Sequence, residues 1–175
     1  KVISEKKNVR MILPNMLTSI GVCIGLTSIR FSFNGQFDLA IIAIIFAALI
    51  AGLDGRIARL IKGTSKVGKE LDSLTDMISF GVAPAFIMYF WTLSSLGRLG
   101  WLICLIYVIC VALRLARFNI NSNQEPSWRD NFFEGVPSPA GGILVLTPLV
   151  ISMTNFDLVK IDNNTIAPIF FIVTS

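Results

Sequence analysis

Long apolar runs alternate with short polar ones along the whole chain. Six apolar segments can be distinguished, at residues 11–29, 37–53, 73–92, 99–118, 138–154 and 164–175. A helix needs about 20 mostly apolar residues to cross a bilayer, and the first five segments are close to that length. The pattern predicts an all-α fold, a polytopic membrane helix bundle with six transmembrane helices in the intact protein. We expect residues 1–175 to form a single membrane domain.

The sixth apolar segment, 164–175, ends after about a dozen residues and is too short to span a bilayer. The chain also begins with Lys1 rather than Met. We therefore expect that the chain is truncated at both ends and that its last helix is incomplete.

The basic residues predict the orientation, since cytoplasmic loops carry an excess of Lys and Arg. If the N-terminus is cytoplasmic, twelve of the fifteen basic residues lie inside and three, Arg30, Arg98 and Lys160, lie outside. The two larger polar stretches, 54–72 and 119–136, then both face the cytoplasm. We expect the functional site at that face of the membrane.

Composition narrows the chemistry that such a site can perform. The chain is 54% hydrophobic and 15% charged, against roughly 25% charged in soluble domains. It contains no histidine, which excludes His-based catalytic triads, and its three cysteines lie inside apolar runs without a CxxC pair. The net charge of +4 is too small to indicate nucleic-acid binding. Acid–base or metal chemistry must therefore come from carboxylates.

Three aspartates, Asp54, Asp72 and Asp76, stand out in the pattern DGxxAR, eight residues, then GxxxDxxxD. Asp72 and Asp76 are four residues apart, so on a helix they share one face and repel each other. Asp54, at the end of the preceding helix, can face the same point. Carboxylate ligands without His or Cys suit hard ions such as Mg²⁺, Mn²⁺ or Ca²⁺. The alternative is structural, with these aspartates paired to neighbouring Arg or Lys side chains.

This stretch resembles the signature of the CDP-alcohol phosphatidyltransferase family, DxxDGxxARx₈GxxxDxxxD. Seven of its eight fixed residues are present, and the first aspartate is replaced by Ala51. The resemblance implies that Asp54, Asp72 and Asp76 bind Mg²⁺ or Mn²⁺ beside the diphosphate of a CDP-activated lipid. It also implies that Asp76 is the general base on the incoming alcohol.

The resemblance further implies a set of substrate-binding residues. The glycines of the signature leave room for a ligand, and its Ala and Arg lie beside them. The stretch LPNMLT at 13–18 corresponds to a region near the nucleotide-lipid site, and the basic stretch 60–73 could bind the diphosphate or lipid headgroups. The residues concerned are Gly55, Ala58, Arg59, Gly68, Asn15, Thr18, Ser65 and Lys66. Helix capping, helix contacts or a solvated loop are the structural alternatives for the last four.

The stretches RLARFN at 114–119 and FFEGVPSPAGG at 132–142 resemble the bacterial phosphatidylserine synthase branch of the family. Its acceptor is L-serine, whose carboxylate Arg114 or Arg117 could bind, although both could instead reach lipid headgroups. The resemblance implies CDP-diacylglycerol as the donor, membrane lipids as surroundings and a homodimer. It implies a bacterial cytoplasmic membrane location with the N-terminus and active site facing the cytoplasm.

Three other hypotheses stay open at this stage. The acceptor could be glycerol 3-phosphate or an inositol phosphate instead of serine. The chain could be an inactive variant of the metal site, because Ala51 cannot replace a carboxylate. A transporter with an acidic ion path would also contain intramembrane carboxylates, but it does not account for the glycine and Ala-Arg spacing.

Overall fold

The protein is described here by a computed structural model that covers residues 2–61, 66–121 and 138–153. Within those ranges the regular elements are all helical, as the sequence predicts. They are α1 (Val2–Phe33), α2 (Phe37–Ile61), α3 (Lys66–Asp76), η1 (Met77–Val82), α4 (Ala83–Trp91), η2 (Leu93–Leu96), α5 (Arg98–Asn121), α6 (Ser138–Val145) and α7 (Thr147–Met153).

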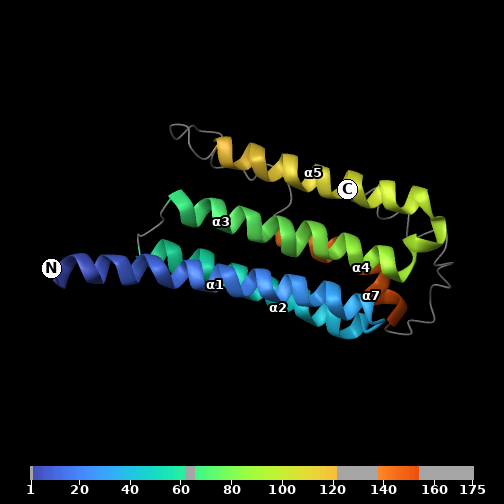
Figure 1. The fold of residues 1–175 in the computed structure, drawn as a ribbon, viewed down its shortest axis with the longest axis horizontal. Coiled ribbons are helices and arrows are strands. Elements are labelled where there is room, and N and C mark those ends of the chain that lie inside the picture. The colour runs from blue at the N-terminus through green and yellow to red at the C-terminus, as the bar shows by residue number, and fades with distance from the viewer. Residues whose placement is uncertain (1, 62–65, 122–137, 154–175) are drawn as a thin grey trace.

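The long helices lie side by side along the long axis of the molecule (Figure 1). In the described part of the chain, four stretches are long and apolar enough to cross a membrane, at Asn15–Phe33, Phe37–Ile57, Gly68–Trp91 and Arg98–Ile120. They match the first four predicted segments, so the prediction of an all-α polytopic membrane bundle is confirmed. The chain is a multi-pass membrane protein.

The helices extend further into the polar stretches than the apolar pattern predicted. α2 continues to Ile61, and α3 already begins at Lys66, so the signature residues lie on helices. Lys and Glu favour helices in a polar setting, which explains why α3 begins before the apolar run does. Asp54 and Asp72 are therefore both held by regular helical backbone, on α2 and α3.

The fifth predicted segment, 138–154, forms two short helices rather than one. α6 ends at Val145 and α7 begins at Thr147, with Pro148 in its first turn. Proline has no backbone N–H to continue an α-helical ladder, which accounts for the break. The sixth segment, 164–175, lies outside the described residues.

The two described connections at the end opposite the N-terminus are short turns. Gly35 (φ 76°) lies between α1 and α2, and Gly97 (φ 58°) lies between η2 and α5. Positive φ favours glycine, so both chain reversals are built where the sequence provides one.

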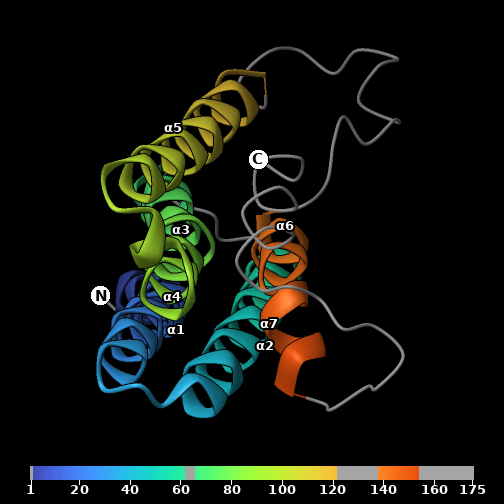
Figure 2. The same ribbon diagram turned by 90° about the vertical axis from the view of Figure 1, so that its right-hand side faces the viewer.

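α3, η1 and α4 follow one another without a break and form the centre of the bundle. Figure 2 shows this central helix with α5 on one side, α1 and α2 on another, and α6 beside it. The buried core includes Ile44, Phe80, Ile87 and Leu149. The C-terminal half of α2 and the helix α3 are thereby held against α1, which creates the site described next.

Candidate active site

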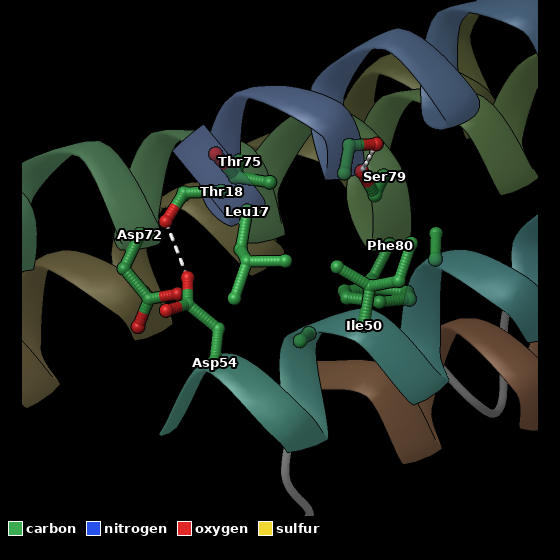
Figure 3. A pocket seen from close by; sticks show the side chains of 11 residues that line it. Leu17, Thr18, Ile50, Asp54, Asp72, Thr75, Ser79 and Phe80 are labelled. Atoms are coloured by element: carbon green, nitrogen blue, oxygen red, sulfur yellow. Dashed lines mark hydrogen bonds between the residues drawn. The ribbon is translucent and has the colours of Figure 1, made fainter. Parts of the chain in front are cut away.

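A small cavity lies where α1, α2, α3 and η1 meet (Figure 3). Its volume is about 10 Å³, close to the space that one water molecule needs. Its lining comprises Leu17, Thr18, Gly21, Ala47, Ile50, Ala51, Asp54, Asp72, Thr75, Ser79 and Phe80. Two carboxylates thus face a confined space that is otherwise apolar or hydroxyl-lined.

Asp54 is the most buried charged residue of this site, with 5% of its surface exposed. Its Oδ2 accepts a hydrogen bond from the hydroxyl of Thr18 on α1. Its Oδ1 is also buried, and it has no hydrogen-bond partner among the described residues. A buried carboxylate oxygen without a partner is costly, so this atom is a candidate ligand for a cation.

Asp72 faces Asp54 across the cavity from α3, and the two carboxyl groups point toward one another in Figure 3. Their charges are close enough to repel. Asp72 is exposed at the rim of the cavity, whereas Asp54 is buried inside it. The two carboxylates therefore extend from the solvent-exposed rim to the interior of the cavity.

Asp76 is one turn further along and does not line the cavity. It is half-buried, and the charges of Asp72 and of Arg114 on α5 both act on it. The structure thus brings Asp54 and Asp72 together at the cavity and leaves Asp76 outside its lining. No three carboxylates or cysteines converge on one point in the described ranges, so the three-aspartate metal site stays a prediction.

The donor set nonetheless fits a hard divalent cation. Asp54 Oδ1 is buried and has no partner in the described part of the chain, and Asp72 lies opposite. Oxygen ligands are what Mg²⁺ and Mn²⁺ prefer. Ala51 lies one turn before Asp54 on α2 and lines the same cavity. Position 51 is where the family signature has its first aspartate. A carboxylate at this position would extend into the cavity, which the short Ala51 side chain leaves open.

The structure gives the predicted substrate-binding residues different surroundings. Thr18 contacts Asp54 directly, whereas Asn15 lies one turn earlier on α1, outside the cavity lining. Gly55 has open space where a side chain would be. Gly68 lies in the first turns of α3, and Arg114 is half-buried while Arg117 is exposed.

Four further predicted residues cannot be placed in the site. Ala58, Arg59 and Lys66 lie on the helices α2 and α3. Ser65 lies outside the described residues, as does most of the stretch 132–142.

Two polar groups that the sequence did not point to join α5 to the central helix. The Ser73 hydroxyl donates to Asn119 Oδ1 (3.1 Å), and the Asn119 amide donates to Glu70 (3.4 Å). The Tyr107 hydroxyl donates to the carbonyl of Phe80 (2.9 Å). Asn119 is the last residue of RLARFN, so its position in that motif was an available signal, while Tyr107 lies in an apolar run without any.

Comparison with known proteins agrees with the signature. The family described as CDP-alcohol phosphatidyltransferase matches residues 11–174. A CDP-diacylglycerol–serine O-phosphatidyltransferase of Mycobacterium leprae is 44% identical over 144 residues, which is 81% of this chain and 48% of that protein. Proteins of the same name from Helicobacter pylori (strain 26695) and Bacillus subtilis are 42% and 34% identical, over 77% of this chain and 56% and 73% of theirs. The chain thus spans about half the length of its mycobacterial relative.

Proposed function

Because the chain belongs to the CDP-alcohol phosphatidyltransferase family, we propose that it transfers phosphatidyl from CDP-diacylglycerol to L-serine. The products are phosphatidylserine and CMP. The observation that carries the proposal is the cavity in which Asp54 and Asp72 face each other, since both belong to the signature of a family that uses a divalent metal. The relatives' names supply the serine acceptor.

In this reaction the serine hydroxyl oxygen attacks the phosphorus that carries the diacylglycerol. A new O–P bond forms, the bond to the bridging oxygen breaks, and CMP leaves with the electron pair. Asp76 takes the hydroxyl proton, since a half-buried carboxylate within reach of an alcohol can act as a general base.

Asp54 and Asp72 would hold Mg²⁺ or Mn²⁺, and Thr18 would fix the orientation of the Asp54 carboxylate. A divalent ion, when bound, offsets the negative charge that develops on the leaving nucleotide. The hydroxyl of Thr18 and the apolar wall of the cavity restrict Asp54 to one arrangement and exclude bulk water.

Arg114 is the better candidate for the serine carboxylate. Its charge acts on Asp76, whereas Arg117 is exposed on the same helix. A guanidinium group beside the base would bind the carboxylate in two-point contact and bring the serine hydroxyl close to Asp76.

The proposal includes the setting of the enzyme. We place it in a bacterial cytoplasmic membrane as a homodimer, with the N-terminus and the active site at the cytoplasmic face. The distribution of Lys and Arg supports the orientation.

The test is an activity assay on the chain reconstituted in vesicles that contain CDP-diacylglycerol. With Mg²⁺ or Mn²⁺ and labelled serine, we expect labelled phosphatidylserine and an equal amount of CMP, and chelation should abolish both. Glycerol 3-phosphate and inositol phosphate serve as competing acceptors. Turnover with either of them and none with serine would rule out the serine assignment.

A second candidate function follows from Ala51, which lines the cavity where a family member has a carboxylate. The chain would then bind the nucleotide lipid but turn it over slowly. The same assay on an Ala51→Asp variant separates the two cases, because only a disabled site gains activity from the added ligand.

A further inference from the structure

The helix that carries Asp72 and Asp76 changes its winding directly after Asp76. Residues Met77–Val82 form the π-helical segment η1, and the Ala83 N–H bonds the Ile78 carbonyl, five residues back. π-Helical turns are rare and occur frequently at functional sites. The π-helical segment η1 is therefore a candidate functional feature, and the contacts that hold it in place matter.

Pro84, in the first turn of α4, has no N–H to donate. It therefore cannot donate to the Phe80 carbonyl, four residues back, as another residue would in an α-helix. The Tyr107 hydroxyl on α5 donates to the same carbonyl at 2.9 Å. Phe80 and Tyr107 are 1% and 3% exposed, so water cannot readily take over this bond.

The contact made by Tyr107 continues along one face of α5. Val111, one turn later, packs against Gly81, where a Cβ atom would lie 3.2 Å from Val111 Cγ1. Arg114 comes next, and its charge acts on Asp76 and on Tyr107. Positions 107, 111 and 114 are spaced for one helix face, so the register at Tyr107 fixes where Arg114 meets the central helix.

We infer that Tyr107 is a positioning residue for the acceptor half of the site. Its hydrogen bond to the Phe80 carbonyl locks the register of α5 against η1 and holds Arg114 opposite Asp76. The link from this role to serine binding rests on the proposed function. The effect of Tyr107 on the register of α5 does not. The two carboxylates of the cavity, Asp54 and Asp72, lie on α2 and α3, about two helical turns from this contact, although the Phe80 side chain also lines the cavity.

The kinetic test replaces Tyr107 by Phe, which removes only the hydroxyl. Tyr89→Phe is the matched control, since Tyr89 is the other tyrosine of the chain and lies on α4 in a cluster of aromatic rings. Both are made in the chain and in its Ala51→Asp form. We expect Tyr107→Phe to raise the KM for serine roughly tenfold, the effect of weakening one charged contact, and to lower kcat.

The KM for CDP-diacylglycerol should stay within about twofold, a difference too small to represent a lost contact. A role in folding alone would lower the amount of active enzyme and leave both KM values unchanged. An unchanged KM for serine in Tyr107→Phe would therefore overturn the inference.

A second variant separates the register role from mere satisfaction of the carbonyl. Pro84→Ala returns an N–H that can donate to the Phe80 carbonyl within the helix but makes no contact with α5. We expect the serine KM of Tyr107→Phe to stay raised when Pro84→Ala is added. Restoration of the serine KM in the double variant would show that Tyr107 only satisfies the carbonyl, and would overturn the register role.

A measurement without turnover separates this inference from the proposed function. Amide hydrogen exchange over residues 77–86 should speed up in Tyr107→Phe and not in Tyr89→Phe, both in detergent micelles. If the parent and its Ala51→Asp form transfer no phosphatidyl to serine while exchange still speeds up, the proposed function fails and the register role stands. Equal exchange in the two Phe variants would refute the register role, whatever the activity.

Discussion

At the scale of single residues, Asp54 has two carboxylate oxygens in different situations. Oδ2 is hydrogen-bonded to Thr18, while Oδ1 is buried without a partner among the described residues. The hydrogen bond from Thr18 therefore orients the Asp54 side chain, and Oδ1 remains available to bind a ligand. Such an arrangement is expected of a ligand, because a purely structural aspartate would gain more from pairing both oxygens.

Replacing Thr18 by Val tests this arrangement. Val has the same shape but no hydroxyl, so a buried carboxylate oxygen loses its donor at a cost of about 1–3 kcal/mol in the free energy of unfolding. We expect a lower thermal midpoint for Thr18→Val in detergent and near-parent stability for Thr18→Ser. Equal midpoints for Val and Ser would mean that the hydroxyl does not support Asp54.

A second single substitution, Ala51→Asp, tests whether the missing carboxylate limits metal binding. Ala51→Asp adds a carboxylate that faces Asp54 and Asp72, so Mn²⁺ affinity should rise by an order of magnitude or more, in line with one added charged ligand. Phosphatidyl transfer should rise with it, measured as phosphatidylserine formed per minute.

Ala51→Asn is the matched control, since it adds a side chain of nearly the same size without the charge. A gain in Asn equal to that in Asp would mean that filling the cavity, rather than ligating an ion, is responsible. No gain in either would show that Ala51 does not limit this site.

At the scale of the helices, α1 packs against the central helix through glycines. A Cβ at Gly21 would lie 3.2 Å from Thr75 Cγ2, and one at Gly25 would lie 2.6 Å from Ser79 Oγ and 3.1 Å from Ser79 Cα. The Ser79 hydroxyl also donates to the Gly21 carbonyl (3.3 Å). Small residues allow this close approach in a membrane, where packing rather than the hydrophobic effect drives helix association. The approach brings Thr18 to Asp54.

Gly25→Ala should therefore disturb the crossing of α1 and η1. The added methyl group meets backbone as well as side chain, so overpacking should cost about 1–3 kcal/mol and lower the thermal midpoint. Transfer activity should fall too, because Thr18 lies two turns away on the same helix. Gly52→Ala is the control, since nothing lies within 4 Å of its added methyl group.

That control should be neutral or slightly stabilising, because Ala favours a helix over Gly by roughly 0.5–1 kcal/mol. If Gly25→Ala behaved like Gly52→Ala, the close crossing would not matter for stability.

At the scale of the whole molecule, the two ends of the bundle differ in the side chains that they carry. The end of α2 and the beginning of α3, the two helices that carry the signature carboxylates, lie toward the end of the bundle that carries the N-terminus (Figure 1). At the other end, Phe33, Phe86, Tyr89, Phe90 and Trp101 form a chain of ring contacts with centroids 5.5–6.0 Å apart. Aromatic belts mark membrane–water interfaces, so the cluster fits the outer interface that the basic residues predict.

Thiol labelling tests this orientation. In a version with Cys23, Cys104 and Cys110 replaced by Ala, a single cysteine is introduced at Ser94 or at Glu70. Ser94 lies in η2 near the aromatic cluster, and Glu70 lies on α3 near Asp72. An impermeant maleimide should label the Ser94→Cys form in intact cells and the Glu70→Cys form only after the membrane is opened. The reverse pattern would invert the proposed topology.

Several properties of the protein could be predicted from its sequence because they depend on local pattern. Apolar runs of span length identified the four long helices, since a bilayer demands that length whatever the neighbours are. The spacing of Asp54, Gly55, Ala58, Arg59, Gly68, Asp72 and Asp76 identified the family, which needs no knowledge of their arrangement.

The tertiary structure decided which residues far apart in the sequence contact one another. Spacing grouped Asp72 with Asp76, since residues four apart share a face, yet Asp72 lines the cavity with Asp54 whereas Asp76 does not. Thr18 was expected beside the nucleotide lipid, and it bonds Asp54 across 36 positions of sequence. Tyr107 gave no signal at all in its apolar run. Such contacts depend on how helices far apart in the sequence cross, and that is set by the glycines and side chains at each crossing together, not by any one segment.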